Sequence, residues 1–139
     1  MTTTTLTAPV ADRTEIAALI LRVTNGIFFV MHAWLKIAIF TPAGTASFFE
    51  SLGLPGFLAY VVIAAELLGG LALIAGFKTR LVALALVPVL LGAIVTAHWN
   101  AGFFFSNEGG GWEYPAYWAV ALIVQFLIGD GAYALGKRV

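Results

Sequence analysis

Four long apolar stretches, separated by clusters of turn-forming residues, dominate the chain. They cover about residues 16–40, 57–77, 81–99 and 115–130, and the last is the shortest. A helix of roughly 20 apolar residues crosses a hydrocarbon core of about 30 Å. Glycine and proline in the intervening segments end such helices. The pattern predicts an all-α polytopic membrane protein whose four spans form an up-down-up-down transmembrane bundle.

The two ends of the chain are expected to lie outside this bundle. Residues 1–15 are polar and predict a flexible N-terminal tail, residues 16–135 form the membrane domain, and residues 136–139 form a C-terminal tail. Lysine and arginine in short loops favour the cytoplasmic side. They occur before the first span, between the second and third, and after the fourth, as Arg13, Lys78, Arg80, Lys137 and Arg138. We therefore expect both termini in the cytoplasm.

Composition supports a bilayer environment and excludes several kinds of site. The chain is 61% hydrophobic and 10% charged, far from the balance of a soluble domain. Its formal net charge is zero, which gives no reason to expect a nucleic-acid partner. The chain has no cysteine, so disulfides, thiolate nucleophiles and iron-sulfur clusters are excluded. The lipid bilayer is the expected partner, and no metal site is predicted.

Most of the polarity of the first span lies on one face. At about 100° per residue, the side chains of this face fall within a sector of roughly 80°. They are Arg22, Asn25, Phe29, His32 and Lys36. A charged group that faces lipid costs several kcal/mol, so this stripe is expected to face the bundle interior.

Two further polar residues lie within the other spans. Glu66 is near the middle of the second span, where it must be either protonated or ionised beside a cation such as Arg22 or Lys36. His98 is near the outer end of the third span, at about the same depth as His32 when the rise is about 1.5 Å per residue. We therefore expect His32, Lys36 and His98 to cluster beneath the outer loops.

Each of these residues also has a purely structural interpretation. Arg22 and Lys36 could extend their charged groups to the lipid head groups. His98, followed by Trp99, could be an interfacial residue favoured by the helix dipole. His32 could be a hydrogen-bonded core residue, and Glu66 could belong to a structural ion pair.

The loops around the outer ends of the spans contain aromatic and acidic residues. The string TASFFESLGLPG predicts a short interfacial helix in the first loop. In NEGGGWEYP, the glycines indicate a mobile loop or a close approach of backbone, and Glu113 precedes a proline suited to a first helical turn. Phe103, Phe104 and Phe105 could form a lid or an interfacial anchor.

Several motifs, taken in order, resemble the DoxX family of small four-span membrane proteins. They are R22 with FFVMHAWLK36, ELLGGLALIAGFKTR from Glu66, TAHWNAGFFF from Thr96 and GGGWEYP from Gly109. The resemblance extends over about residues 16–133. It implies a protein of the prokaryotic cytoplasmic (inner) membrane that is a component of an oxidoreductase. Some relatives are linked to quinone reduction coupled to the oxidation of sulfur compounds.

The leading hypothesis is a quinone-interacting subunit of a membrane oxidoreductase. His32, Lys36 and Glu66 are the candidate catalytic residues, because histidine and a buried carboxyl exchange protons readily. The candidate quinone-binding residues are Arg22, His32, Lys36, His98, Trp99, Glu113 and Tyr114. Arg22 is also expected to form, with Glu66, a proton path toward the cytoplasm.

Two alternatives stay open. Haem ligation by His32 and His98 is disfavoured, because ligating histidines are usually oriented by partners that the sequence does not identify. The main rival is a non-catalytic membrane anchor, scaffold or small-molecule carrier for a soluble oxidoreductase, with the outer loops as its docking surface. The sequence leaves a homo-oligomer equally open.

Overall fold

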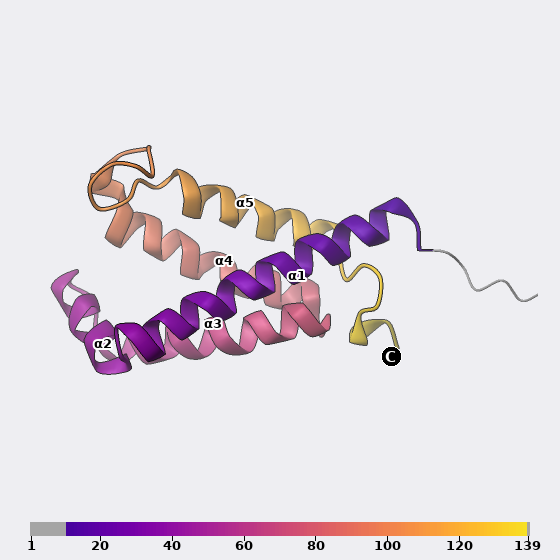
Figure 1. Cartoon of the computed structure of the whole chain (residues 1–139), viewed down its shortest axis with the longest axis horizontal. Helices are drawn as coiled ribbons and strands as arrows, with labels where there is room; N and C mark the ends of the chain where they lie inside the picture. Colours follow the sequence, from indigo (N-terminus) through magenta and orange to yellow (C-terminus); the bar gives the residue numbers. More distant parts are fainter. Residues whose placement is uncertain (1–10, 139) are drawn as a thin grey trace, which may run out of the picture.

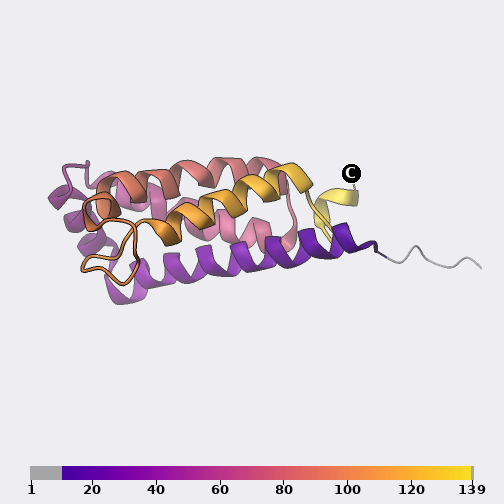
Figure 2. The ribbon, with the colours of Figure 1, turned by 90° about the horizontal axis from the view of Figure 1, so that it is seen from above.

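The chain folds into a bundle of four long helices, and one further, short helix between the first two of them lies at one end of the bundle. The computed structural model of the protein describes residues 11–138, and all regular structure in that range is helical. Helices α1 (Arg13–Trp34), α3 (Phe57–Ala75), α4 (Thr79–Ala93) and α5 (Glu113–Ile128) run side by side in alternating directions (Figures 1 and 2). The prediction of an all-α bundle is confirmed.

Two of the long helices continue through π-helical turns. Leu35–Ile39 extends α1, and Ile94–His98 extends α4 before a 3-10 turn at Trp99–Ala101. With these extensions, Arg13–Ile39, Phe57–Ala75 and Thr79–Ala101 are long and apolar enough to cross a membrane, whereas α5 has 16 residues. π-Helical turns often occur at functional sites, and here they carry Lys36 and His98.

Local signals fix where the helices begin and end. The Asp12 side chain accepts a hydrogen bond from the backbone N–H of Glu15 at 2.8 Å and caps α1. Thr41 caps α2 (Pro42–Ser51), which confirms the helix expected in the first loop. Gly76 ends α3 with φ 75°, a left-handed conformation that glycine adopts without strain.

The structure changes the bounds predicted for the two terminal tails. Residues 1–10 lie outside the described residues, and residues 13–15, which the prediction placed in the N-terminal tail, belong to α1. At the other end, Leu135–Arg138 forms a 3-10 turn. The N–H of Gly136 donates to the carbonyl of Gly76 at 2.9 Å, so this segment is attached to the end of α3.

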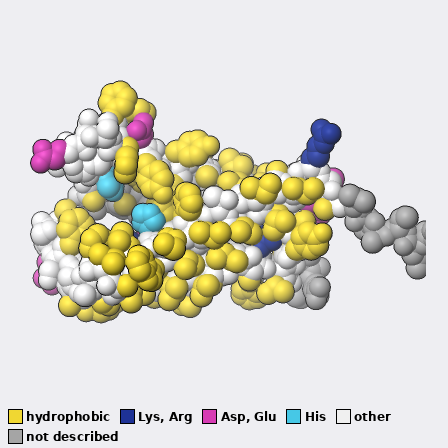
Figure 3. All heavy atoms as spheres, in the orientation of Figure 1, with side chains coloured by type: hydrophobic (Ala, Val, Ile, Leu, Met, Phe, Trp, Pro, Cys, Tyr) yellow, Lys and Arg dark blue, Asp and Glu magenta, His cyan; other side chains and the backbone are white. Residues whose placement is uncertain are grey.

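The helices pack most closely as two pairs, α1 with α3 and α4 with α5. A central cluster of apolar side chains joins the pairs, with Phe29, Leu73 and Leu122 wholly buried. The long sides of the bundle instead expose large apolar side chains, among them Leu68, Leu81 and Val95, as the yellow surface in Figure 3 illustrates. Such sides suit contact with lipid, because lipid tails are apolar.

Two glycines set the separation of α1 and α3. A Cβ added to Gly70 would lie 2.8 Å from the carbonyl oxygen of Gly26, and one on Gly26 would lie 2.6 Å from the carbonyl oxygen of Gly70. Small residues at such crossings let helix backbones approach each other in membranes. The close approach therefore depends on both glycines.

Gly70→Ala is expected to lower the free energy of unfolding by about 1–3 kcal/mol, because the added methyl group forces the two backbones apart. Gly92→Ala is the matched control, since nothing lies within 4 Å of a Cβ at Gly92. Circular dichroism during unfolding in detergent measures both variants. Equal stabilities of the two variants would contradict this packing.

Candidate polar site and aromatic pocket

The two charged residues of the polar stripe on the first span, Arg22 and Lys36, have different partners in separate parts of the bundle. The Arg22 side chain, 1% exposed, lies about four turns before Lys36. Its guanidinium donates hydrogen bonds to four backbone carbonyls, those of Leu73, Ile74, Asp130 and Ala132, at 2.6–3.0 Å. Arg22 thus joins α1 to the end of α3 and to the segment after α5, rather than extending to lipid head groups.

Lys36 and Glu66 form an ion pair between α1 and α3. Lys36 Nζ lies 2.8 Å from one Glu66 carboxylate oxygen and 3.0 Å from the other. The side chains of Lys36 and Glu66 are only 17% and 6% exposed. Lys36 therefore points into the bundle, and it is the cation that faces Glu66. Attraction between the charges is strong at such a site because little water screens them.

His32 lies one helical turn before Lys36, on the same face of α1. Its ring centroid is 5.0 Å from that of Trp118 on α5, and the Trp118 ring also contacts Phe28, Phe29 and Tyr114. Trp118 is 5% exposed, and its Nε1 has no hydrogen-bond partner among the described residues. The half-buried imidazole thus contacts an aromatic cluster and lies one helical turn from Lys36.

Trp118 was not among the predicted site residues. The structure places its ring in the core of the bundle. The spacing of Trp118, Leu122 and Gln125, all buried on one face of α5, is the signal that could have identified it.

His98 is held by the third loop. Its Nδ1 lies 2.6 Å from the carbonyl oxygen of Gly110, and because a carbonyl only accepts, Nδ1 carries the proton. The Trp99 ring stacks on Trp112, with centroids 6.1 Å apart. Backbone N–H groups of Gly111, Trp112 and Glu113 bond back to residues 102–104. These bonds give the loop a defined conformation.

The glycines of the third loop allow a close approach of backbone, one of the two predicted alternatives. A Cβ on Gly111 would collide with the carbonyl oxygens of Phe103 and Phe104. The adjoining Glu113 uses Oε1 to accept the N–H of Phe105 at 2.9 Å. Glu113 therefore joins the start of α5 to the loop.

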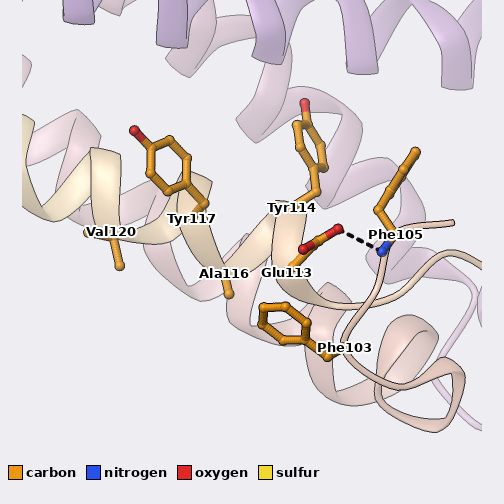
Figure 4. Close-up of a pocket in the computed structure, with 7 residues that line it drawn as sticks. All are labelled: Phe103, Phe105, Glu113, Tyr114, Ala116, Tyr117 and Val120. Atoms are coloured by element: carbon orange, nitrogen blue, oxygen red, sulfur yellow. Dashed lines mark hydrogen bonds between the residues drawn. The ribbon is translucent and has the colours of Figure 1, made fainter. Parts of the chain in front are cut away.

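Glu113 and Tyr114 line a pocket beside the first turns of α5. The pocket has a volume of about 630 Å³, and Figure 4 shows its lining residues, Phe103, Phe105, Glu113, Tyr114, Ala116, Tyr117 and Val120. The Tyr114 ring contributes to this pocket and also packs against Trp118, with centroids 5.8 Å apart. The pocket therefore adjoins the aromatic cluster around His32.

The predicted site residues thus form three groups, and Arg22 lies apart from them. Lys36, Glu66 and His32 lie together, and Glu113 and Tyr114 share the adjoining pocket. His98 and Trp99 lie at the third loop, whereas Arg22 lies toward the opposite end of the bundle. No cluster of three or more histidine, aspartate or glutamate side chains suited to a metal ion occurs within residues 11–138.

Comparison with known proteins identifies the family. The family model described as DoxX matches residues 17–99, which include Arg22, the Lys36–Glu66 pair and His98. The chain belongs to the DoxX family. The match spans more than half of this DoxX protein and ends before the third loop and α5.

This DoxX protein is similar to two named relatives. It is 43% identical over 94 residues to "Putative oxidoreductase CatD" of Bacillus subtilis, covering 68% of this chain and 69% of the relative. It is 40% identical over 70 residues to "Inner membrane protein YqjF" of Escherichia coli, covering 50% of this chain and 52% of that relative. No solved structure matches. The chain is a membrane protein related to one that is named an oxidoreductase.

Proposed function

We propose that this DoxX protein is a quinone-interacting subunit of a membrane oxidoreductase system. The observation that carries the proposal is the buried Lys36–Glu66 ion pair with His32 one turn away. Ionisable groups inside a membrane are costly and commonly mark a path for protons or substrate. The name of the Bacillus subtilis relative supports the redox class.

The residues present fit a quinone, whose flat apolar ring has two carbonyl oxygens. Lys36 and His32 supply hydrogen-bond donors, and Glu66 supplies a carboxyl that can take up a proton. The rings of Phe28 and Trp118 supply apolar surface beside His32. A bound quinone would supply two-electron, two-proton redox chemistry.

The ion pair couples proton uptake to a change in hydrogen bonding. A proton that reaches Glu66 removes the negative charge that holds Lys36 Nζ at 2.8–3.0 Å. Lys36 is then free to donate to another acceptor, and loss of the proton restores the pair. His32, one turn away, can relay a proton, because a neutral imidazole both donates and accepts a hydrogen bond. In this proposal Arg22 joins the helices and does not contact the ligand.

We also propose that α5 is the fourth span and that both termini face the cytoplasm. Lys78 lies in the short turn between α3 and α4, and Arg80 lies in the first turn of α4, at the end of the bundle opposite the long loop. Cytoplasmic loops favour such residues. The name of the Escherichia coli relative supports placement in an inner membrane.

Cysteine labelling tests this orientation, because the natural chain has no cysteine. A membrane-impermeant maleimide added to intact cells is expected to label Glu108→Cys in the third loop and to leave Lys78→Cys unlabelled until the cells are lysed. The reverse pattern would contradict the proposed orientation.

The functional proposal is tested on protein purified in mild detergent. We expect solvent extraction to release quinone from the wild type, and an oxidised-minus-reduced spectrum to show the quinone band. His32→Gln is expected to lose most of the quinone, whereas Glu50→Gln, a change on the exposed surface of α2, should retain it. A Soret band would indicate haem instead. Folded protein without quinone or haem would contradict the redox proposal.

The third loop favours a second candidate, a non-catalytic anchor or carrier for a soluble oxidoreductase. Trp99 and Phe104 are 61% and 62% exposed on a loop fixed by backbone hydrogen bonds. Exposed aromatic side chains of this kind often form the centre of a protein interface. If this candidate is right, Phe104→Ser releases a co-purifying partner, and folded wild-type protein contains no quinone.

A further inference from the structure

The pocket beside α5 contains an acidic side chain without a basic partner. Glu113 contributes its carboxylate to the lining, and no lining residue is basic. No ion pair with Glu113 occurs among the described side chains of residues 11–136. In the sequence, no lysine or arginine occurs between Arg80 and Lys137. No described basic side chain therefore pairs with the carboxylate at the pocket.

Aromatic side chains make up most of the remaining wall. Phe103 and Phe105 come from the third loop, and Tyr114 and Tyr117 come from α5. Figure 4 shows the Glu113 carboxylate between the side chains of Phe103 and Phe105, with both tyrosine hydroxyls on one side of the helix. Faces of aromatic rings carry partial negative charge and attract cations. Carboxylate and rings thus favour the same kind of ligand.

We propose that this pocket binds an apolar organic cation, an ammonium or phosphonium group attached to hydrocarbon. The cation could be the ammonium head group of a membrane lipid or a free lipophilic cation, because the two share this chemistry. A volume of about 630 Å³ falls within the range of small-molecule sites, roughly 300–1,000 Å³. The hydrocarbon of the ligand would contact the apolar side chains of Ala116 and Val120.

The pocket walls are held in place before any ligand binds. The N–H groups of Gly111 and Glu113 donate to the carbonyls of Phe104 and Phe103, and Glu113 Oε1 accepts the N–H of Phe105. A prearranged site loses less entropy on binding than one that must be ordered. The carboxylate therefore has a structural role, but that role requires only an acceptor oxygen and not a negative charge.

This inference does not depend on the proposed quinone site. The pocket is lined by none of His32, Lys36 and Glu66. A failure to bind quinone would leave the cation site untouched, and a failure to bind cations would leave the quinone proposal untouched.

A pair of probes of matched shape and opposite charge tests the proposal. Calorimetric titration of the purified protein with tetraphenylphosphonium, corrected for detergent alone, is expected to show saturable binding, whereas tetraphenylborate should bind at least about tenfold more weakly. Glu113→Gln keeps an acceptor for Phe105 and removes the charge. It should weaken tetraphenylphosphonium binding by roughly tenfold, while Glu108→Gln, in the same loop but outside the pocket, should leave binding unchanged.

A second variant keeps the test independent of any disturbance at Glu113. Ala116→Phe fills the pocket and keeps the Glu113 carboxylate, and we expect it to abolish tetraphenylphosphonium binding. Mass spectrometry of retained lipid then separates the two sources. Phosphatidylethanolamine that is present in the wild type and lost in Glu113→Gln identifies a lipid head group, and its absence identifies a free cation. Equal binding of both probes, or binding unaffected by Glu113→Gln and Ala116→Phe, would overturn the proposal.

Discussion

Glu66→Leu is expected to lower the free energy of unfolding by about 3–5 kcal/mol, the typical cost of removing one partner of a buried ion pair. The substitution leaves the Lys36 ammonium facing the α1–α3 interface, where the Glu66 carboxylate now lies 2.8 Å from it. Stability in detergent, followed by circular dichroism against increasing denaturant, measures the loss.

The double variant Lys36→Met with Glu66→Leu is the matched control. Apolar side chains of similar size often replace a buried ion pair at little cost, so most of the lost stability should return. A double variant as unstable as Glu66→Leu, or a Glu66→Leu protein as stable as wild type, would show that the charge pair does not contribute as described.

Arg22→Met is the second substitution with a large expected effect. It should lower the free energy of unfolding by at least about 3 kcal/mol, because each buried carbonyl left without a donor costs about 1–3 kcal/mol. Four carbonyls now accept from Arg22, two at the end of α3 and two in the segment after α5. Thermal unfolding measures the loss, and limited proteolysis should show cleavage after α5.

Arg80→Met provides the comparison for Arg22. Arg80 also donates to two backbone carbonyls, those of Phe126 and Leu127, but it is exposed, so water can replace it. Its removal should cost about 1 kcal/mol or less. Similar losses for the two arginine variants would contradict a special role for Arg22 in holding the bundle together.

The helices could be predicted from the sequence because each apolar stretch ends at a strong local signal. Gly76 and Pro42 mark ends that the structure reproduces. The π-helical turns at Leu35–Ile39 and Ile94–His98 could not be predicted, because they shift the helical phase without leaving a signal such as glycine or proline. The start of α1 was placed late, since its first turn is polar and carries no apolar pattern.

The site could be predicted only in part. The α1 stripe correctly indicated that polar side chains face inward, but the partner of Glu66 depends on how α1 and α3 are rotated and offset, which sequence spacing does not fix. Arg22 donates hydrogen bonds to backbone carbonyls. Every residue has such a carbonyl, so the residue types in the sequence do not identify these partners. The Nε1 of Trp118 lies in the core because of the orientation of α5, which has few polar residues to indicate its inner face.

Titration of quinone-depleted, purified protein with a short-chain quinone tests the central claim most directly. We predict saturable binding of about one quinone per chain in the wild type and in Glu50→Gln. Binding should be lost in Lys36→Gln, which removes the ammonium proposed to donate to a quinone carbonyl and keeps a hydrogen-bond donor for Glu66. Folded wild-type protein that binds no quinone, or Lys36→Gln protein that binds it as tightly as wild type, would contradict the assignment of the Lys36–Glu66 pair to a quinone site.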